Sequence, residues 1–402
     1  MRSTFSVTIC LFILSFLFFS CSDSNPKSSK NLEQQEIDSI STINQDSINQ
    51  ILKEIHAKEK SALLDVLFKK REKAGFNACV LVSQRGQIIY QKAFGFSNLK
   101  AKTPLTLDSE FQLASASKPL TAAAILLLKD QGKLKLTDTI QQFFPDFPYP
   151  HITILQLLNH RSGLANYIYF CEPFCDDNNC YNGKVFDNAS MLNIINNTKP
   201  ELYAKPNKKF EYCNTNYALL ALIIEKVSHK NYATFMKEEI FIPLGMNHSH
   251  VADVIVKNTV PNKTIGHTPS GKAEDEEYAD AVLGDKGIYS TVGDLFKFNK
   301  ALYSEKLLKR NTIEEAYTGY SNEHKGTRNY GLGWRLIQKE GKSKVIYHNG
   351  WWHGYSSLFY RRLADETCIV VLSNKFSRIT YQIQDVLTIL DGKETDSEIE
   401  SE

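Results

Sequence analysis

Segments with the residue pattern of β-strands lie near both ends of the chain, and segments with the pattern of helices lie between them. Residues 77–83 and 87–94 are strand-like runs on either side of Arg85-Gly86, which is the pattern of a β-hairpin. Four more such runs follow late in the chain, at 334–338, 344–348, 355–360 and 367–372. No long linker separates the two groups, so we expect one sheet that is closed by the two chain ends.

The candidate helices fill the stretch between these strands. They lie at 118–130, 154–158, 217–228, 232–239 and 292–302. We therefore expect an α/β fold of the α+β kind, in which helices flank the sheet and a mostly helical lobe is inserted at about residues 120–285. A chain of 402 residues is ample for such a core and a formed active site.

The first twenty residues have the character of an export signal. Arg2 precedes an apolar run at 5–19, which is short for a span that needs ~20 apolar residues and fits a cleaved secretory segment. Ser20 followed by Cys21 resembles the lipobox of bacterial lipoproteins, which implies cleavage at residue 20 and lipid attachment to Cys21. The alternative is an uncleaved anchor helix. Both place the protein outside the cytoplasm, and the lipoprotein interpretation places it in the cell envelope, facing the periplasm or the exterior.

The flanks of the folded part are polar. Residues 21–50 are rich in Ser, Asn, Gln and Asp and predict a flexible tether, and 393–402 form an acidic tail. A helical pattern from about residue 48 leads into a single domain at 51–392. The 47 basic and 45 acidic side chains nearly balance, which excludes a polybasic nucleic-acid binder, so we expect no nucleic-acid partner.

A serine and a lysine three residues apart precede the most apolar helix of the chain. Ser115 and Lys118 are followed by Pro119, which a first helical turn tolerates, and by an apolar run at 120–128. The spacing places both side chains on one helical face. A lysine in a dry site can accept the proton of a serine nucleophile, and a helix N-terminus offers N–H groups to an oxyanion. A capping serine beside a surface lysine is the alternative interpretation.

A second motif lies at the start of another apolar helix. Tyr212 and Asn214 flank Cys213, directly before the run 217–224. Tyr212 would relay a proton, and Asn214 would orient a substrate amide through its two polar ends. A capping role for Asn214 or Thr215 explains the same residues without any chemistry.

A strand that runs into glycines and large rings forms the third motif. His348, Asn349 and Gly350 are followed by Trp351 and Trp352. Gly350 permits a substrate backbone to approach closely, as an added strand would. The rings are more typical of a pocket wall than of core filling.

In their order and separation, the three motifs resemble those of class C β-lactamases and penicillin-binding-protein-like serine hydrolases. Four further segments match this family as well: Leu157–Leu164, Ile242–Met246, Gly287–Leu295 and Tyr330–Trp334. The resemblance spans about residues 76–390, which is nearly the whole folded part. It implies an antiparallel sheet flanked by helices, with a mostly helical lobe beside it.

The resemblance also implies a mechanism without cofactor or metal. Ser115 would attack a carbonyl carbon and form an acyl-enzyme, while Lys118 and Tyr212 manage the protons. The backbone N–H groups of Ser115 and Trp351 would hold the oxyanion. Asn214 would orient the substrate, and water would release the acid.

One departure from the family bears on the substrate. β-Lactamases of this class carry Lys-Thr-Gly where this chain has His348-Asn349-Gly350, and that lysine helps to hold a substrate carboxylate. A neutral histidine is a weaker partner for an anion, although it becomes charged below its ordinary pKa of ~6.5. His-x-Gly resembles the version found in esterases, aminopeptidases and some D-peptidases of the family.

We therefore expect a serine hydrolase for a small-molecule or peptide-like ester or amide, of the esterase, D-aminopeptidase or D,D-carboxypeptidase class. A penicillin-binding or sensing module that deacylates slowly is one alternative, and a true β-lactamase is another. An inactive interaction scaffold is a third alternative, against which the retained polar motifs argue.

The cysteines give a separate expectation. Cys171, Cys175 and Cys180 lie close together in a polar segment, and disulfides are the first expectation for an exported protein, with the pairing left open. A zinc site with a fourth ligand from elsewhere is the alternative. Cys79 and Cys368 lie on apolar strands and are expected in the core.

Overall fold

The computed structural model describes residues 44–178, 186–252, 262–274, 278–323 and 326–392. Residues up to Ile51 and those from Leu52 onward form separate units. The first unit is helical from residue 44, so the end of the predicted tether is helical. The signal segment, Cys21, the rest of the tether and the acidic tail lie outside the described residues. The elements that follow all belong to the second unit.

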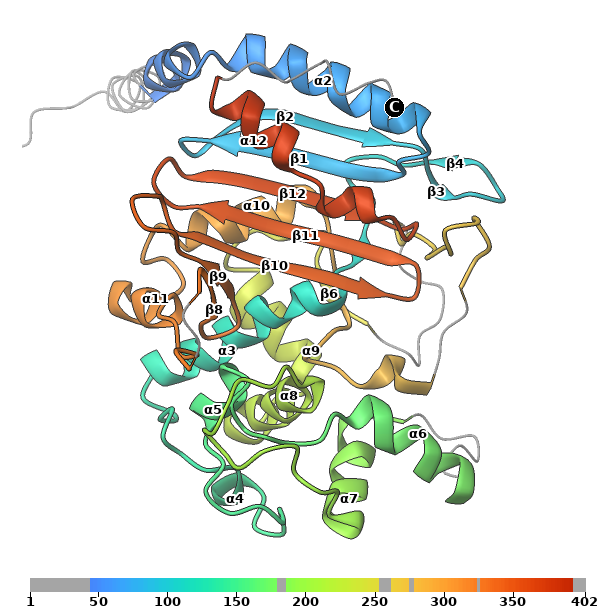
Figure 1. The fold of residues 1–402 in the computed structure, drawn as a ribbon, viewed down its shortest axis with the longest axis vertical. Coiled ribbons are helices and arrows are strands. Elements are labelled where there is room, and N and C mark those ends of the chain that lie inside the picture. The colour runs from blue at the N-terminus through green and yellow to red at the C-terminus, as the bar shows by residue number, and fades with distance from the viewer. Residues whose placement is uncertain (1–43, 179–185, 253–261, 275–277, 324–325, 393–402) are drawn as a thin grey trace, which may run out of the picture. The chain divides into compact units, whose positions relative to one another are not determined.

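Seven antiparallel strands from both ends of the chain form the main sheet. They are β1 (Ala78–Gln84), β2 (Gln87–Phe94), β8 (Arg328–Tyr330), β9 (Arg335–Ile337), β10 (Val345–Trp352), β11 (Tyr355–Arg362) and β12 (Thr367–Ser373). Their order is β2-β1-β12-β11-β10-β9-β8, so an early strand pairs with the last one. This order, visible in Figure 1, confirms the sheet that we predicted from the two chain ends.

Helices cover both faces of the sheet, which is why β1 and β12 are buried at every position. Helix α2 (Ala57–Lys73) packs on β2 and on α12 (Gln384–Leu390), whereas α10 (Val292–Ala301) packs on β1 and β12. Arg85 and Gly86 have φ values of 49° and 69° between β1 and β2. Two positive φ values match the turn that suits a tight hairpin, as the Arg-Gly pair predicted.

A helical lobe carries most of the remaining chain and lies below the sheet in Figure 1. It contains α3 (Lys118–Asp130), α4 (Ile140–Phe143), α5 (Ile154–Leu158), α6 (Tyr167–Asn178), α7 (Asn188–Thr198), α8 (Asn214–Ser228), α9 (Tyr232–Phe235) and a π-helical turn at Met236–Phe241. Helix α11 (Arg310–Ala316) follows α10. The lobe is therefore inserted between the strands of one sheet, as expected.

Two smaller sheets complete the fold. Strands β3 (Phe96–Asn98) and β4 (Thr103–Pro104) form one, and β5 (Phe111–Gln112), β7 (Ile288–Ser290) and β6 (His250–Val251) form the other, in the order β5-β7-β6. The pairing of Phe111 with Ser290 brings the segment before β7 alongside the start of α3. This contact positions the site described below.

Part of the segment that carries the three neighbouring cysteines is helical. Cys171 and Cys175 lie within α6 and are buried in the core. Cys180 lies outside the described residues. Cys79 and Cys368 are buried in β1 and β12. None of the helices in the described ranges is long and apolar enough to cross a membrane.

Candidate active site

Ser115 lies in a 3₁₀ turn, Ala114–Ser117, between β5 and α3. Ala114 has a φ of 49°, which is uncommon for a residue with a Cβ atom and turns the chain sharply before the helix. Every residue from Ser109 to Leu126 is buried except Ser115, which is partly exposed. A substrate can therefore reach this hydroxyl in a stretch that is otherwise core.

Lys118 begins α3 and is fully buried. Its Nζ donates to Ser115 Oγ over 3.1 Å and to the backbone carbonyl of Asp285 over 2.9 Å. The same nitrogen lies 5.1 Å from the ring centre of Tyr212 and 5.6 Å from that of Tyr217. Among the described residues, no carboxylate lies within ion-pair distance of it. The burial of Lys118 therefore excludes the interpretation of a surface lysine. Its contact with Tyr212 brings the first and second sequence motifs together.

Tyr212 and Asn214 lie on either side of Cys213, the N-cap residue of α8. His160 fixes this segment, because its Nδ1 accepts from the Cys213 N–H at 3.2 Å and contacts the Asn216 side-chain nitrogen at 3.1 Å. The His160 and Tyr212 ring centres are 4.4 Å apart. Asn214 Oδ1 is buried and has no hydrogen-bond partner in the described part of the chain. A polar atom left in this way is available to a substrate.

His348 is fully buried in β10. Its Nδ1 lies 2.8 Å from the Asn349 carbonyl, which can only accept, and its Nε2 lies 3.1 Å from the Tyr330 hydroxyl. Burial, followed by the charges of Arg335 and Lys118, holds the pKa of His348 well below its ordinary value. Both ring nitrogens have partners, and the lowered pKa disfavours the charged His348 that would hold a substrate carboxylate.

Gly350 packs against the turn that carries Ser115. A Cβ atom on Gly350 would lie 2.2 Å from the Leu113 carbonyl and 3.0 Å from the Ser115 nitrogen, so glycine permits this approach. The β10 backbone therefore lies beside the Ser115 N–H. The predicted oxyanion site combines this N–H with that of Trp351, the residue after Gly350 in β10. The Trp351 side chain itself is 60% exposed and packs edge-on against Phe376.

The side chain of Asn349 is not brought to this site. Successive side chains of a strand point to opposite faces, and Asn349 lines a groove of about 650 Å³ with Tyr347, Leu358 and residues of α12. This groove lies on the other face of the sheet from His348 and Gly350. Our prediction of Asn349 as a substrate-binding residue is therefore wrong for its side chain.

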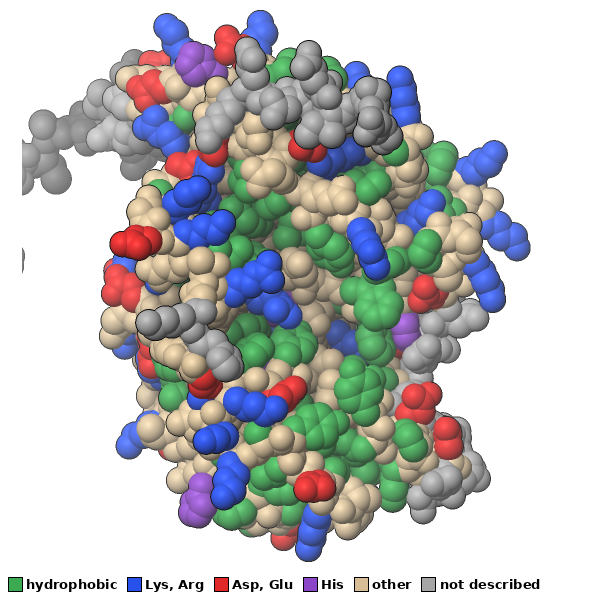
Figure 2. Space-filling view, in the orientation of Figure 1, with side chains coloured by type: hydrophobic (Ala, Val, Ile, Leu, Met, Phe, Trp, Pro, Cys, Tyr) green, Lys and Arg blue, Asp and Glu red, His purple; other side chains and the backbone are tan. Residues whose placement is uncertain are grey.

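Several residues of the site had no role in our sequence analysis. Arg335 lies with its guanidinium carbon 5.1 Å from the centre of the Tyr212 ring. A pocket of about 340 Å³ borders it, lined by Lys209, Phe210, Ser321, Glu323, Arg328, Asn329, Tyr330, Arg335 and Tyr347. The family-like segment Tyr330–Trp334 includes one residue of this pocket but ends just before Arg335. The sequence analysis therefore gave no role to the positive charge of Arg335. Figure 2, in the orientation of Figure 1, shows hydrophobic side chains gathered across the middle of the visible face of the molecule, with Lys and Arg side chains beside them.

The chemistry of the site is that of proton transfer and hydrogen bonding. No group of three or more His, Cys, Asp or Glu side chains within the described ranges is placed to hold a metal ion. The groups that converge are the hydroxyl of Ser115, the amino group of Lys118, the phenol of Tyr212 and the amide of Asn214. Such a set suits nucleophilic attack on a carbonyl carbon.

The fold and the site together are those of serine hydrolases that work through an acyl-enzyme. The chain belongs to the beta-lactamase family, whose model matches residues 64–392. It is 35% identical over 328 residues to penicillin-binding protein 4* of Bacillus subtilis (strain 168), covering 77% of this chain and 71% of that protein. It is 26% identical over 309 residues to the putative penicillin-binding protein PbpX of the same strain, covering 75% of this chain and 71% of that one.

Solved structures agree with this assignment. The octameric penicillin-binding protein homologue from Pyrococcus abyssi superposes with a TM-score of 0.71 and 26% identity, covering 83% of this chain and 77% of that one. The D-amino acid amidase from Ochrobactrum anthropi SV3 superposes with a TM-score of 0.62 and 23% identity, covering 78% of this chain and 91% of that one, and this likeness shows the fold alone. These neighbours confirm the predicted fold class.

Proposed function

We propose that Ser115 is the nucleophile of a hydrolase that acts on a small-molecule or peptide-like ester or amide. The observation that carries this proposal is the 3.1 Å hydrogen bond between the partly exposed Ser115 hydroxyl and the buried Lys118. Serine is a poor nucleophile until a neighbouring base takes its proton. Lys118 is placed to do this in its neutral form.

In the proposed reaction, Ser115 Oγ forms a bond to the carbonyl carbon as its proton moves to Lys118. The resulting oxyanion binds the N–H groups of Ser115 and Trp351. Tyr212, whose ring lies against Lys118, takes part in returning a proton to the leaving group. Water then attacks the acyl-enzyme and regenerates Ser115 as the acid leaves. Asn214 Oδ1 accepts from a substrate N–H during these steps.

The substrate class follows from the charges around the site. The pKa of His348 is held well below its ordinary value and both its nitrogens are engaged, so it is a weak partner for an anion. Arg335, beside Tyr212, supplies a cation instead. We therefore propose an esterase, D-aminopeptidase or D,D-carboxypeptidase type of substrate, whose carboxylate, where present, contacts Arg335.

A second candidate function is a penicillin-binding or sensing module that acylates once and deacylates slowly. Two relatives of the chain are named as penicillin-binding proteins, which favours this alternative. The two candidates share the acylation step and differ only in the rate at which water releases the acyl group. A true β-lactamase would show rapid release of the hydrolysed antibiotic.

We also propose that the protein is anchored in the cell envelope through lipid on Cys21. The support is the sequence of the first 21 residues, with an apolar run followed by Ser20-Cys21. Lipid attachment there would hold the domain at a membrane surface, facing the periplasm or the exterior.

Intact-protein mass spectrometry tests the proposed function. The full-length protein is mixed with p-nitrophenyl acetate, with D-alanine p-nitroanilide or with benzylpenicillin, and is quenched at intervals. We expect an adduct of the acyl group that is absent from Ser115→Ala. An adduct that disappears within seconds supports a turnover enzyme, and one that persists for minutes supports the sensing module. Equal labelling of both proteins would contradict the role of Ser115.

A further inference from the structure

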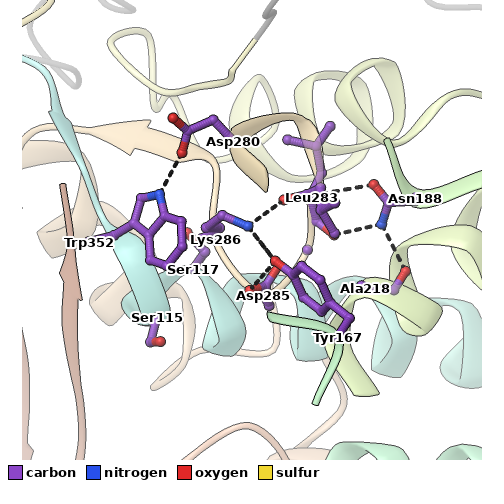
Figure 3. A network of polar contacts seen from close by, with 12 residues as sticks. Ser115, Ser117, Tyr167, Asn188, Ala218, Asp280, Leu283, Asp285, Lys286 and Trp352 are labelled. Carbon is purple, nitrogen blue, oxygen red and sulfur yellow. Dashed lines mark hydrogen bonds and ion pairs between the residues drawn. The ribbon is translucent and has the colours of Figure 1, made fainter. Parts of the chain in front are cut away.

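Asp285 contacts two buried lysines and presents a different group to each of them. Its backbone carbonyl accepts from Lys118 Nζ at 2.9 Å, whereas its carboxylate lies 3.7 Å from Lys286 Nζ. Tyr167 bridges the second contact, because its hydroxyl donates to Asp285 Oδ2 at 3.2 Å and accepts from Lys286 Nζ at 2.5 Å. Figure 3 shows Lys286, Tyr167 and Asp285 joined in this way close to Ser115 and Ser117.

Lys286 is held on several sides. It is 3% exposed, donates to the Val282 carbonyl at 3.1 Å and lies 4.9 Å from the ring centre of Trp352. Burial lowers its pKa, and the carboxylates of Asp285 and Asp280 act in the opposite direction. A buried cation needs a partner, and in the described part of the chain Asp285 is the carboxylate within ion-pair distance.

The backbone around Asp285 is fixed independently of these side chains. Thr121 Oγ1 donates to the Gly284 carbonyl at 2.7 Å, and the Ile288 N–H donates to Ser117 Oγ at 3.3 Å. The Leu113 N–H donates to the Ile288 carbonyl at 2.8 Å. These contacts hold the backbone on both sides of Asp285 without using its carboxylate. The backbone carbonyl and the side-chain carboxylate of Asp285 are therefore positioned by different groups.

We propose that Lys286 is a positioning residue that keeps the Asp285 carboxylate turned away from Lys118. Lys118 thereby has no carboxylate partner among the described residues, which favours the neutral amine that accepts the proton of Ser115. An ammonium has no lone pair to receive a proton, and a carboxylate beside it favours the charged form. This inference rests on the proposed roles of Ser115 and Lys118.

The electrostatic surroundings of Lys118 make Asp285 the group that matters. The rings of Tyr212 and Tyr217 face Lys118, and its charge acts on the buried imidazoles of His160 and His348 and on Lys286. Arg335 lies across the Tyr212 ring. Apart from Asp285, these facing groups are cationic or neutral. A carboxylate of Asp285 without its counter-charge would therefore favour the protonated form of Lys118.

The test is the acid limb of the pH profile of kcat/KM for p-nitrophenyl acetate, measured on the full-length protein. In Lys286→Met the Asp285 carboxylate loses its counter-charge and stabilises protonated Lys118, so the acid limb moves to higher pH by about one to three units. In Asp285→Asn the carbonyl remains and Lys286 loses its counter-charge, so the limb moves to lower pH. The double variant Asp285→Asn/Lys286→Met removes both charges and returns the limb to its original position.

Lys297→Met is the matched control, because it removes a lysine from a different pair, 2.8 Å from Asp294, and should leave the acid limb in place. Circular dichroism and thermal melts confirm that each variant is folded. If Lys286→Met does not fold, Asp285→Asn alone decides, since an unchanged acid limb in that variant would overturn the proposal. An unchanged limb in a folded Lys286→Met, or a double variant that stays displaced, would also overturn it.

The failure of this inference is distinguishable from that of the proposed function. Acylation of the wild-type protein that disappears in Ser115→Ala establishes the function first. If that acylation is present and the acid limbs of the variants do not move as stated, only the role of Lys286 fails. If it is absent, the roles of Ser115 and Lys118 fail before Lys286 is considered.

Discussion

Lys118 Nζ donates a hydrogen bond to Ser115 Oγ over 3.1 Å, across a single turn at the start of α3. The lysine is buried and the serine is partly exposed, so the pair joins the dry interior to the surface that a substrate reaches. A base in a dry environment gains less from being charged, which favours its use as a proton acceptor.

Replacement of Lys118 by Met should reduce the rate of acylation by about 10²–10⁴-fold, the range of general-base catalysis. The reason is that Ser115 loses the amine that lies within hydrogen-bond distance of its hydroxyl. Lys129→Met is the matched control on the same helix, where Lys129 pairs with Glu315 at 2.7 Å. Single-turnover ester cleavage measures both variants. Equal loss in the two would show a stability effect rather than a catalytic one.

Gly350→Ala should abolish acylation and lower the melting temperature. The added Cβ would lie 2.2 Å from the Leu113 carbonyl, so β10 must move away from the Ser115 turn. That movement separates the two N–H groups of the proposed oxyanion site. In contrast, Gly326→Ala meets nothing within 4 Å and should behave like the wild type. A fully active Gly350→Ala would contradict the placement of the oxyanion site.

Arg335→Met should discriminate between substrates by charge. For a p-nitrophenyl ester whose acyl part ends in a free carboxylate, we expect KM to rise about 10- to 100-fold, the equivalent of one charged hydrogen bond of about 1.5–3 kcal/mol. For the uncharged acetate ester, KM should change little. Arg310→Met, at an exposed arginine, serves as the control. Equal changes with both esters would remove Arg335 from anion binding.

Stability should fall as the solution becomes acidic, because two buried imidazoles resist protonation. Burial holds the pKa values of His160 and His348 well below the ordinary value, whereas in the unfolded chain they return to ~6.5. Below pH ~6.5 the unfolded state binds protons that the folded state does not. The free energy of unfolding should therefore decrease by up to about 1.4 kcal/mol per pH unit for each histidine.

Urea denaturation between pH 7.5 and pH 5 measures this slope. His348→Gln should show a shallower dependence than the wild type, because one of the two imidazoles is gone. The contribution is fully present above pH ~6.5 and is lost progressively below it. A free energy of unfolding that does not change over this range would contradict the neutral, buried state of both histidines.

The lipid anchor is tested by metabolic labelling in a bacterial host. With an alkyne fatty acid in the medium, the full-length protein should incorporate label and sediment with membranes, and Cys21→Ser should do neither. Cys10→Ser, within the same apolar run, should label like the wild type. Membrane sedimentation of Cys21→Ser without label would favour the uncleaved anchor helix instead.

Much of the fold could be predicted because single segments carry strong local signals. Helices α3 and α5 have the predicted boundaries, because clear signals mark where they start. A first-turn proline lies at the start of α3, and a capping threonine lies at the start of α5. The hairpin of β1 and β2 was predicted from Arg85-Gly86, whose backbone needs two positive φ values. The site motifs were found for the same reason, because each is a short group of polar residues next to an apolar helix or strand.

The remainder of the site depends on contacts between distant residues. Asp285 is 167 residues from Lys118, and Tyr167 is 118 residues from Asp285, so no local pattern connects them. Asn349 was assigned to the site because His348-Asn349-Gly350 was interpreted as one unit, although alternation in a strand turns its side chain to the opposite face. The buried state of Cys171 and Cys175 depends on the packing of α6, which a polar local sequence concealed.

The central claim is acyl transfer through Ser115, and stopped-flow hydrolysis of p-nitrophenyl acetate tests it most directly. For the full-length protein, we predict a burst of p-nitrophenol equal to the enzyme concentration, followed by a steady rate that reports deacylation. Ser115→Ala should show no burst, while retaining the melting temperature of the wild type. A burst of the same amplitude in Ser115→Ala would contradict the account.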